Sequence, residues 1–147
     1  MRLTYYTDYS LRVLIYLATA GTGRLVQMKE IADAYGISKN HLMKVIYELG
    51  KTGWIETIRG RGGGIRLGMK AEEINIGTVV RRTEEDFYMV ECFHDGKNAC
   101  ILSPVCQLKH TLQEALEAYF RVLDGYTLAD LTHNQRQLSL LLGHPVT

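Results

Sequence analysis

The chain has 147 residues, enough for one small domain with a helical extension, and its composition is that of an ordinary globular protein. Its net charge is only +1, but residues 1–68 carry ten Lys and Arg against five Asp and Glu, whereas residues 69–147 carry seven against eleven. A basic first half indicates contact with a polyanion, and the absence of a long apolar run excludes a membrane-spanning helix.

The first predicted element is a helix that begins near Thr7 and Asp8, because an apolar run with helical spacing follows them. On that pattern, the simplest role for Asp8 is an N-cap. Gly21 and Gly23 are expected to end the helix. Residues 12–20 imitate a signal peptide, but the apolar core is short and Asp8 lies where positive charge should dominate. We therefore expect a first helix in a cytoplasmic protein.

Residues 28–49 have the pattern of a helix–turn–helix. Ala32 is small enough for a close helix crossing, and Gly36 suits the turn between the helices. A plain helical hairpin with a solvated face is the alternative. If the motif binds DNA, the start and outer face of its second helix would present the contacts. These candidate DNA-binding residues are Ser38, Lys39, Asn40, His41 and Lys44.

The next segment is a predicted β-hairpin with a glycine-rich basic tip. Residues 54–58 favour a strand, residues 59–64 are mostly glycine and arginine, and residues 65–67 favour a second strand. Such a wing would place Arg59 and Arg61 at phosphates or in a minor groove. A nucleotide-binding phosphate loop is excluded, because no Gly-Lys-Ser/Thr follows and no helix is expected to start there.

All three cysteines lie within fifteen residues, at Cys92, Cys100 and Cys106. Turn-forming residues between them indicate a loop. Because all three thiols lie on this one loop, they are expected to bind one shared group. An iron–sulfur cluster fits three soft ligands, although such clusters usually have four protein ligands. Zinc sites favour closer cysteine pairs. A thiol–disulfide switch and three unconnected buried cysteines are the other possibilities.

The segments around this loop are less distinctive. Residues 71–80 are expected to hold a short helix or linker, and residues 81–86 a solvated run of charges. From Gln107 an apolar stripe with spacings of three and four predicts a helix of about four turns. The small domain has little core surface for this apolar stripe to pack against. We therefore expect the stripe to form a dimer interface. Residues 124–131 suggest a turn and one helical turn, and the last dozen residues are expected to be loosely held.

Four stretches in combination resemble the NsrR-type nitric-oxide-sensing repressors, part of a winged-helix family that also holds the iron–sulfur regulator IscR. They are residues 7–12, 36–45, 59–67 and 124–131, and the resemblance extends from Met1 to about Leu131. It implies a homodimeric repressor with a near-palindromic operator, whose affinity falls when nitric oxide attacks its cluster.

The resemblance also implies ligands. The three family cysteines fall on Cys92, Cys100 and Cys106, and the fourth ligand falls on Asp8, reaching across from the other subunit. The IscR branch has a histidine where this chain has Lys109, which favours the NsrR branch. The implied cofactor is a [4Fe–4S] cluster, with [2Fe–2S] as second choice. The fallback ligands are His94 and His110.

The predicted fold is therefore mainly α with a small β-hairpin. Residues 1–80 would form the winged helix–turn–helix domain, 81–106 the cluster-binding region, 107–131 the dimerisation helix and turn, and 132–147 a tail. A regulator that senses thiol oxidation without a cluster and a general iron–sulfur or iron-status regulator are the alternatives. An iron–sulfur carrier or small redox enzyme has no use for the DNA-binding motifs, and we expect no catalysis.

Overall fold

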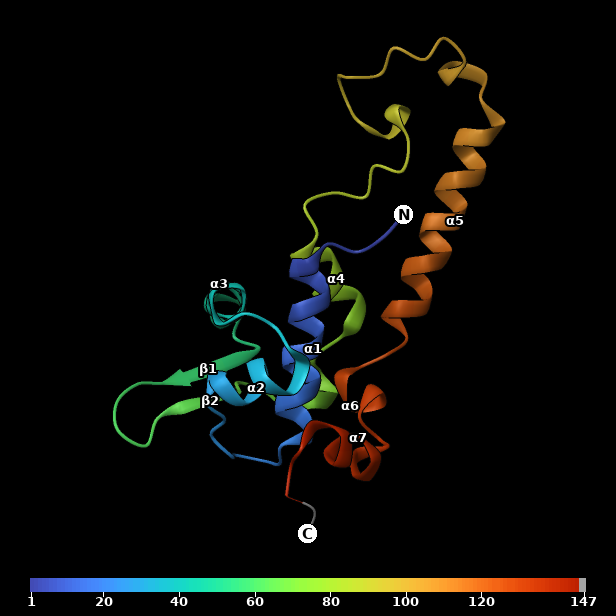
Figure 1. The fold of residues 1–147 in the computed structure, drawn as a ribbon. Coiled ribbons are helices and arrows are strands. Elements are labelled where there is room, and N and C mark those ends of the chain that lie inside the picture. Colours follow the sequence, from blue (N-terminus) through green and yellow to red (C-terminus); the bar gives the residue numbers. More distant parts are fainter. Residues whose placement is uncertain (146–147) are drawn as a thin grey trace.

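The computed structural model describes residues 1–145 and confirms a mainly helical fold with one two-stranded hairpin. Figure 1 shows a body that holds most of the elements and one long helix, α5, that rises from it. The helices are α1 (Tyr5–Thr19), α2 (Met28–Tyr35), α3 (Lys39–Thr52), α4 (Ile76–Thr83), α5 (Gln107–Asp124), α6 (Leu128–Leu131) and α7 (Gln135–Leu142). The strands are β1 (Ile55–Ile58) and β2 (Gly64–Leu67), and the 3-10 turns are η1 (Ala71–Glu73), η2 (Glu91–Phe93) and η3 (Ser103–Val105).

The core of the body lies where α1 meets α2, α3, α4 and the hairpin. Most of its members are apolar side chains at helical spacing on the helices, which the sequence pattern predicts, and the rest lie on the strands and connecting segments. Several of them are completely buried: Val13, Leu14, Val26, Ile31, Leu42, Leu49, Ile74, Val79 and Leu128.

The first helix begins earlier than expected. Its N-cap is Thr4, whose hydroxyl accepts a hydrogen bond from the backbone N–H of Thr7 at 3.3 Å. Asp8 therefore lies inside the first turn of α1, and the prediction that it caps the helix is wrong. Its carboxylate is available for side-chain partners instead.

The helix–turn–helix prediction is confirmed by α2 and α3. Gly36 ends α2 in the left-handed conformation, with φ of 66°, which a side chain would strain. Ser38 then caps α3, because its hydroxyl accepts from the backbone N–H of His41 at 3.3 Å. The turn thus has the residues that its backbone needs.

The hairpin is also confirmed. Strands β1 and β2 pair antiparallel, with Ile55 opposite Leu67 and Ile58 opposite Gly64. Val26 pairs with Ile65 through two backbone hydrogen bonds of 2.8 Å, which ties the hairpin to the segment before α2. A side chain at Gly63 would overlap the backbone of Ile58, so this glycine allows the tight tip.

A second tie joins α4 to the end of α5. The two guanidinium nitrogens of Arg81 donate to the two carboxylate oxygens of Asp124, at 2.5 and 2.8 Å. The guanidinium carbon of Arg81 also lies 4.2 Å from the centre of the Phe120 ring. The expectation of a merely solvated charge run is therefore wrong at Arg81, and it is wrong at Glu84, which accepts hydrogen bonds from Thr4.

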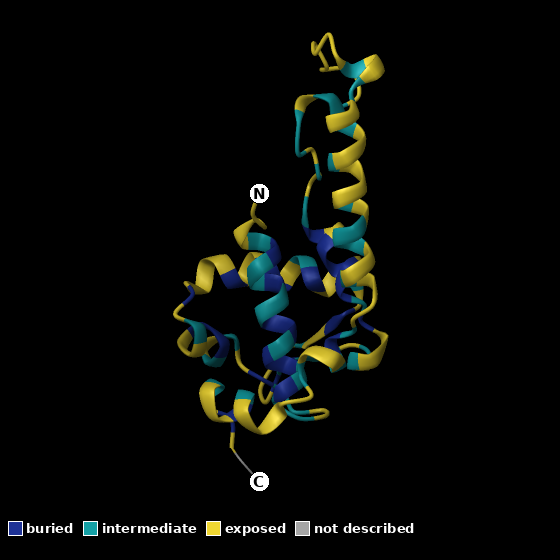
Figure 2. Ribbon diagram, turned by 90° about the vertical axis from the view of Figure 1, so that its right-hand side faces the viewer, coloured by how far each residue is buried: buried dark blue, intermediate teal, exposed yellow. Residues whose placement is uncertain are grey.

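Helix α5 carries no buried residue along its 18 positions. Figure 2 shows α5 and the cysteine segment near its far end coloured yellow and teal, whereas the dark blue buried residues lie within the body. The helix contacts the body mainly through α4. Its position agrees with the prediction of a helix that the small domain cannot cover.

The C-terminal residues are more ordered than expected. Residues 135–142 form α7, which packs on α1, and His144 is buried against the ring of Tyr16 at a centroid distance of 4.3 Å. The expectation of a loose tail fails here because these contacts join residues more than 100 positions apart. The last two residues of the predicted tail, 146–147, lie outside the described residues.

Candidate nucleic-acid interface and cysteine segment

The second helix of the helix–turn–helix presents a polar and basic outer face. Its inner face is buried at Leu42, Val45, Ile46 and Leu49, so the residues between them point outward. All five predicted DNA-binding residues of this motif are exposed: Ser38, Lys39, Asn40, His41 and Lys44. The geometry is that of a recognition helix, with a capped N-terminus and a solvent-facing side available for a major groove.

The structure adds three side chains that the sequence reasoning did not select. Met43 and Tyr47 are 56% and 63% exposed, and Lys51 lies with its ammonium 4.4 Å from the centre of the Tyr47 ring. All three follow Lys39 at intervals of four residues, so the helical spacing in the sequence could have predicted that they share its face. They continue the outer face of α3 beyond the predicted set.

The wing presents its two predicted arginines to solvent. Arg59 and Arg61 are exposed at the tip of the hairpin, and no ion pair engages either of them within residues 1–145. Arg66, in contrast, pairs with Glu56 across the strands at 2.9 Å. The tip is therefore a concentrated positive charge on glycine-rich backbone, suited to phosphate.

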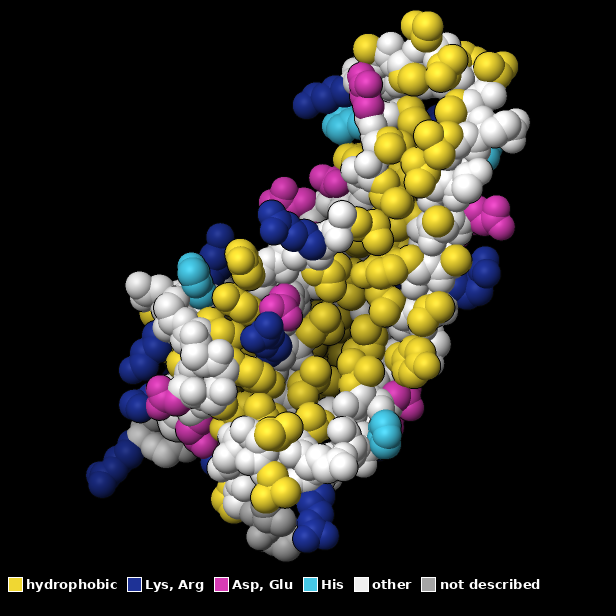
Figure 3. Space-filling view, turned by 45° about the vertical axis from the view of Figure 1, so that its right-hand side comes forward, with side chains coloured by type: hydrophobic (Ala, Val, Ile, Leu, Met, Phe, Trp, Pro, Cys, Tyr) yellow, Lys and Arg dark blue, Asp and Glu magenta, His cyan; other side chains and the backbone are white. Residues whose placement is uncertain are grey.

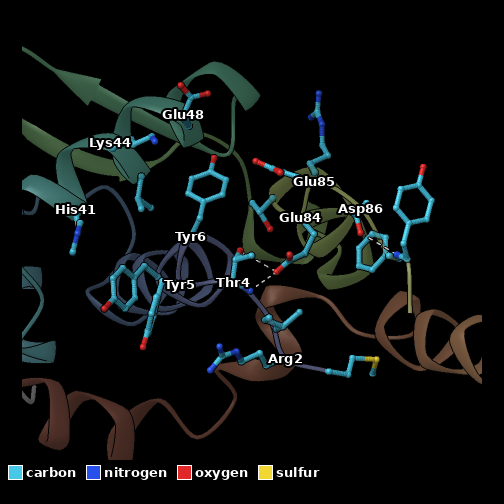
Figure 4. A pocket seen from close by; sticks show the side chains of 18 of the residues that line it. Arg2, Thr4, Tyr5, Tyr6, His41, Lys44, Glu48, Glu84, Glu85 and Asp86 are labelled. Atoms are coloured by element: carbon cyan, nitrogen blue, oxygen red, sulfur yellow. Dashed lines mark hydrogen bonds between the residues drawn. The ribbon is translucent and has the colours of Figure 1, made fainter. Parts of the chain in front are cut away.

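A groove of about 1560 Å³ runs between the start of the chain, α3, the segment after α4 and α5. Figure 4 shows Glu84 bonded to Thr4 on one side and His41, Lys44 and Glu48 of α3 on the other. Tyr6 lies between them, and burial raises the pKa of its hydroxyl, with the Glu48 carboxylate adding to the effect. The groove thus joins the recognition helix to the segment that leads to the cysteines.

Asp8 is held by an exposed ion pair on α1. Its oxygens accept from Arg12 at 3.1 and 2.8 Å, and both side chains are about 40% exposed. The Arg12 guanidinium also lies 5.8 Å from the ring centres of Tyr9 and Tyr35. An exposed pair of this kind contributes about 0–1 kcal/mol, so Asp8 can exchange this partner at little cost.

The three cysteines are free and lie on the irregular segment that precedes α5. Cys92 and Cys106 are partly exposed, and Cys100 is exposed. Cys106 caps α5, since its sulfur accepts from the backbone N–H of Lys109 at 3.4 Å. The N-terminus of a helix favours a negative group, which suits a thiolate ligand there.

Within residues 1–145 of one chain, no three His, Cys, Asp or Glu side chains converge as a metal site would require. Asp8 lies on α1 in the body, whereas the cysteine segment lies near the far end of α5 (Figure 1). Of the fallback ligands, His94 stacks on Tyr88 at 4.7 Å and His110 is exposed on α5. The donor set nevertheless has the chemistry that iron–sulfur clusters need, because it supplies three unpaired thiols on one short segment.

A band of apolar side chains connects the cysteine segment to the body. Figure 3 shows it as a continuous yellow track along the molecule. Its large, strongly exposed members on the cysteine segment and α5 are Ile101, Leu102, Val105, Leu108 and Val122. Exposed apolar surface of this kind is typical of regions that contact another molecule.

None of the described helices combines the length and the apolar character that crossing a bilayer requires.

Comparison with known proteins identifies the family of this chain. Residues 3–134 match the Rrf2 family, described as iron-dependent transcriptional regulator. The chain is 66% identical to the HTH-type transcriptional regulator NsrR of Bacillus licheniformis, over 97% of this chain and 99% of that protein. It is 65% identical to NsrR of Bacillus subtilis, over 97% of each chain.

Solved structures show the same fold. The oxidized form of Staphylococcus aureus CymR matches with a TM-score of 0.74 and 27% identity, over 90% of this chain and 97% of that one. The IscR of T. potens matches with a TM-score of 0.74 and 22% identity, over 94% and 90%. The second likeness concerns the fold alone, since its sequence identity is low.

Proposed function

Because this chain belongs to the Rrf2 family of iron-dependent transcriptional regulators, we propose that it is a homodimeric repressor that releases its operator in response to nitric oxide. The observation that carries the proposal is the arrangement of one molecule: an exposed recognition helix and basic wing on the body, and three free thiols on a separate segment. A DNA-binding regulator with a separate sensor needs both parts. The chain has no role as an enzyme in this proposal, in keeping with relatives that are named transcriptional regulators.

The DNA-binding side rests on residues 1–80. Helix α3 would enter the major groove with its N-terminal residues at base edges, and Arg59 and Arg61 would contact the backbone or a minor groove. In a dimer these contacts repeat with two-fold symmetry, so the operator would be near-palindromic, with half-sites about 34 Å or a multiple of that apart.

The sensing side rests on residues 81–106. Cys92, Cys100 and Cys106 would hold a [4Fe–4S] cluster, or a [2Fe–2S] cluster as second choice, and Asp8 of the other subunit would be the fourth ligand. A carboxylate is a harder and more exchangeable ligand than a thiolate. When bound, the cluster would supply iron atoms that react with nitric oxide.

Asp8 connects the two sides through its choice of partner. Its carboxylate pairs with Arg12 within its own chain, and a ligand role would require it to leave that pair. Arg12 in turn contacts Tyr9, whose ring lies 6.3 Å from that of His41 at the start of α3. A change of partner at Asp8 would therefore be felt at the recognition helix.

Residues 107–131 supply the dimer contacts in this proposal. The apolar band on α5 has no buried position within one chain, and a second copy would cover it. The same contact would bring the α1 helix of one subunit towards the cysteine segment of the other.

The test uses the full-length protein purified without oxygen. We expect absorbance near 400 nm, a dimer mass that includes iron and sulfide in native mass spectrometry, and sequence-specific binding to a promoter duplex. Addition of nitric oxide should change the mass and the spectrum and release the duplex. Replacement of any one cysteine, for example Cys106→Ser, should remove the absorbance.

Other outcomes would support the alternatives. A colourless protein that releases DNA when its thiols are oxidised would be a thiol sensor without a cluster. A coloured protein that releases DNA on iron chelation but ignores nitric oxide would be an iron-status regulator. Failure to bind any promoter duplex, with the cluster intact, would contradict the proposal as a whole.

A further inference from the structure

The outer face of α3 carries a stripe of four residues spaced four apart: Lys39, Met43, Tyr47 and Lys51. Residues four apart lie next to one another on one side of a helix. The stripe is therefore basic at both ends and apolar in the middle. Such an order is unusual on a solvent-facing surface, where polar side chains are the rule.

The middle of the stripe is free within one chain. Met43 is 56% exposed and Tyr47 is 63% exposed, although both are large apolar side chains. The inner face of the same helix is filled by Leu42, Val45 and Ile46, so the core has no need of Met43. Met43 is therefore exposed because it lies on the outer face of α3, and its exposure leaves no gap in the core.

The charges around these two residues favour a polyanion as the partner. The acidic residue of α3 is Glu48, and it is already engaged by Lys51 at 3.0 Å. The Lys51 ammonium lies 4.4 Å from the centre of the Tyr47 ring, which holds the charge over the end of the stripe. The remaining positive charge of Lys39 and Lys44 suits phosphates.

The dimensions of the stripe fit a major groove. The twelve residue steps from Lys39 to Lys51 rise by about 18 Å and turn by roughly 120° around the helix axis. The major groove of B-DNA is about 12 Å wide. Lys39, which has no ion-pair partner among residues 1–145, can therefore contact a phosphate at one rim while Met43 faces the base edges, and Lys51 stays engaged by Glu48.

We propose that Met43 reads the 5-methyl group of a thymine in each operator half-site. The only apolar group that a base pair presents in the major groove is this methyl group, and side chains without polar atoms recognise it by contact. Met43 is the fifth residue of α3, in the half of a recognition helix that reaches base edges. The inference rests on the proposed DNA-binding function and names one of its sequence-determining contacts.

The experiment replaces thymine by deoxyuridine, which removes only the methyl group. The probe is a duplex enriched by the wild-type full-length protein from a random-sequence library. Each symmetry-related pair of thymines is replaced in turn, and dissociation constants are measured by fluorescence anisotropy. Wild type should lose about fourfold per half-site at one thymine position, the equivalent of one methyl-sized group no longer buried.

The variants locate this loss at Met43. M43Q keeps the length and the helix-forming tendency of methionine but is polar. It should bind the thymine duplex more weakly and become insensitive to deoxyuridine at that one position, while M43L should remain sensitive. Its salt dependence should equal that of wild type, because Met43 neutralises no phosphate.

One control variant and two further outcomes complete the test. L141A removes an exposed apolar side chain from α7 and should leave affinity and deoxyuridine sensitivity unchanged. If wild type and M43Q respond alike to deoxyuridine at every thymine, the inference is wrong while the DNA-binding function stands. If no duplex is enriched from the library, the DNA-binding function itself fails.

Discussion

At the scale of single residues, Asp8 gives the most direct test of the sensing side. Its ion pair with Arg12 is exposed and lies within α1. We expect Asp8→Ala to leave a dimer that takes up iron but that reacts with nitric oxide at a changed rate, because the proposed fourth ligand is lost. Stopped-flow absorbance on the anaerobic protein measures that rate.

The matched control is Asp33→Ala. Asp33 also forms an exposed pair with a residue four positions away, Lys29, and carries the same charge. Its loss should leave spectrum and rate unchanged. If Asp8→Ala behaves like Asp33→Ala, the fourth ligand is another group, and His94 and His110 become the candidates.

The wing arginines allow a second prediction at this scale. Arg59→Ala and Arg61→Ala should each weaken binding to duplex DNA and lower the slope of log affinity against log salt by about 0.9, the contribution of one phosphate contact. Gel shifts over a series of salt concentrations measure the slope. Arg136→Ala changes an exposed arginine on α7 and should leave the slope unchanged. An unchanged slope in the wing variants would show that the wing does not contact the DNA.

At the scale of elements, the joint between α4 and α5 depends on a glycine. Gly77 lies where a Cβ atom would overlap the Asp124 carboxylate that Arg81 holds. We expect Gly77→Ala to displace the Asp124 carboxylate and weaken its pair with Arg81, which costs about 0–1 kcal/mol because both side chains are exposed and can move. Thermal and urea unfolding measure the change.

Gly50→Ala is the matched control for this joint. Gly50 is also helical, but nothing lies within 4 Å of the position that its Cβ would take. Alanine there should raise the free energy of unfolding by roughly 0.5–1 kcal/mol, because it favours the helix. Gly77→Ala has the same gain in helix propensity, offset by the weakened ion pair, so it should be less stabilising than Gly50→Ala. Equal changes in the two variants would contradict the assigned role of Gly77.

The contact of the C-terminal segment with α1 should depend on pH. Burial against Tyr16 lowers the pKa of His144, the nearby Arg24 adds to this, and Glu30 opposes it. The folded state therefore binds fewer protons than the unfolded state at this position. The stabilisation is complete above pH of about 6.5 and is lost as the pH falls towards the lower pKa of the folded state.

Hydrogen exchange measures this effect. After correction for intrinsic exchange rates, the amides of residues 135–144 should be less protected at pH 5.5 than at about pH 7.5, and His144→Phe should abolish the difference. His133→Gln, which changes an exposed histidine, should keep it. Equal protection at both pH values in wild type would show that His144 does not anchor the segment.

Short sequence patterns predicted the helices, turns and hairpin that depend on neighbouring residues. Gly36 and Ser38 specify the turn and the cap of the helix–turn–helix, and the glycines of the wing specify its tip. The contacts of Arg81, Glu84 and His144 could not be predicted, because each joins residues more than 40 positions apart. For the same reason, the sequence indicated three thiols on one loop but not how their sulfurs are arranged.

At the scale of the whole molecule, the exposed apolar band predicts how two copies meet. Val122 is 62% exposed on α5. We expect Val122→Glu to shift the protein towards the monomer, because a charge in a buried apolar contact is costly. Sedimentation velocity measures the distribution. Leu141→Glu on α7, where the side chain is 84% exposed, should leave the dimer intact, and a Val122→Glu dimer of wild-type affinity would place the contact elsewhere.

The length of α5 makes it a lever arm. Its 18 residues span about 27 Å, and Arg81 and Asp124 act as the fulcrum at its base. A tilt of about 7° at that fulcrum displaces the opposite end by roughly 3.4 Å, which is the axial step between neighbouring nucleotides of one strand. In the proposed dimer, a tilt that barely changes the contacts at the base of α5 would therefore move the contact at its far end, and with it the partner's recognition helix, by about one base-pair step.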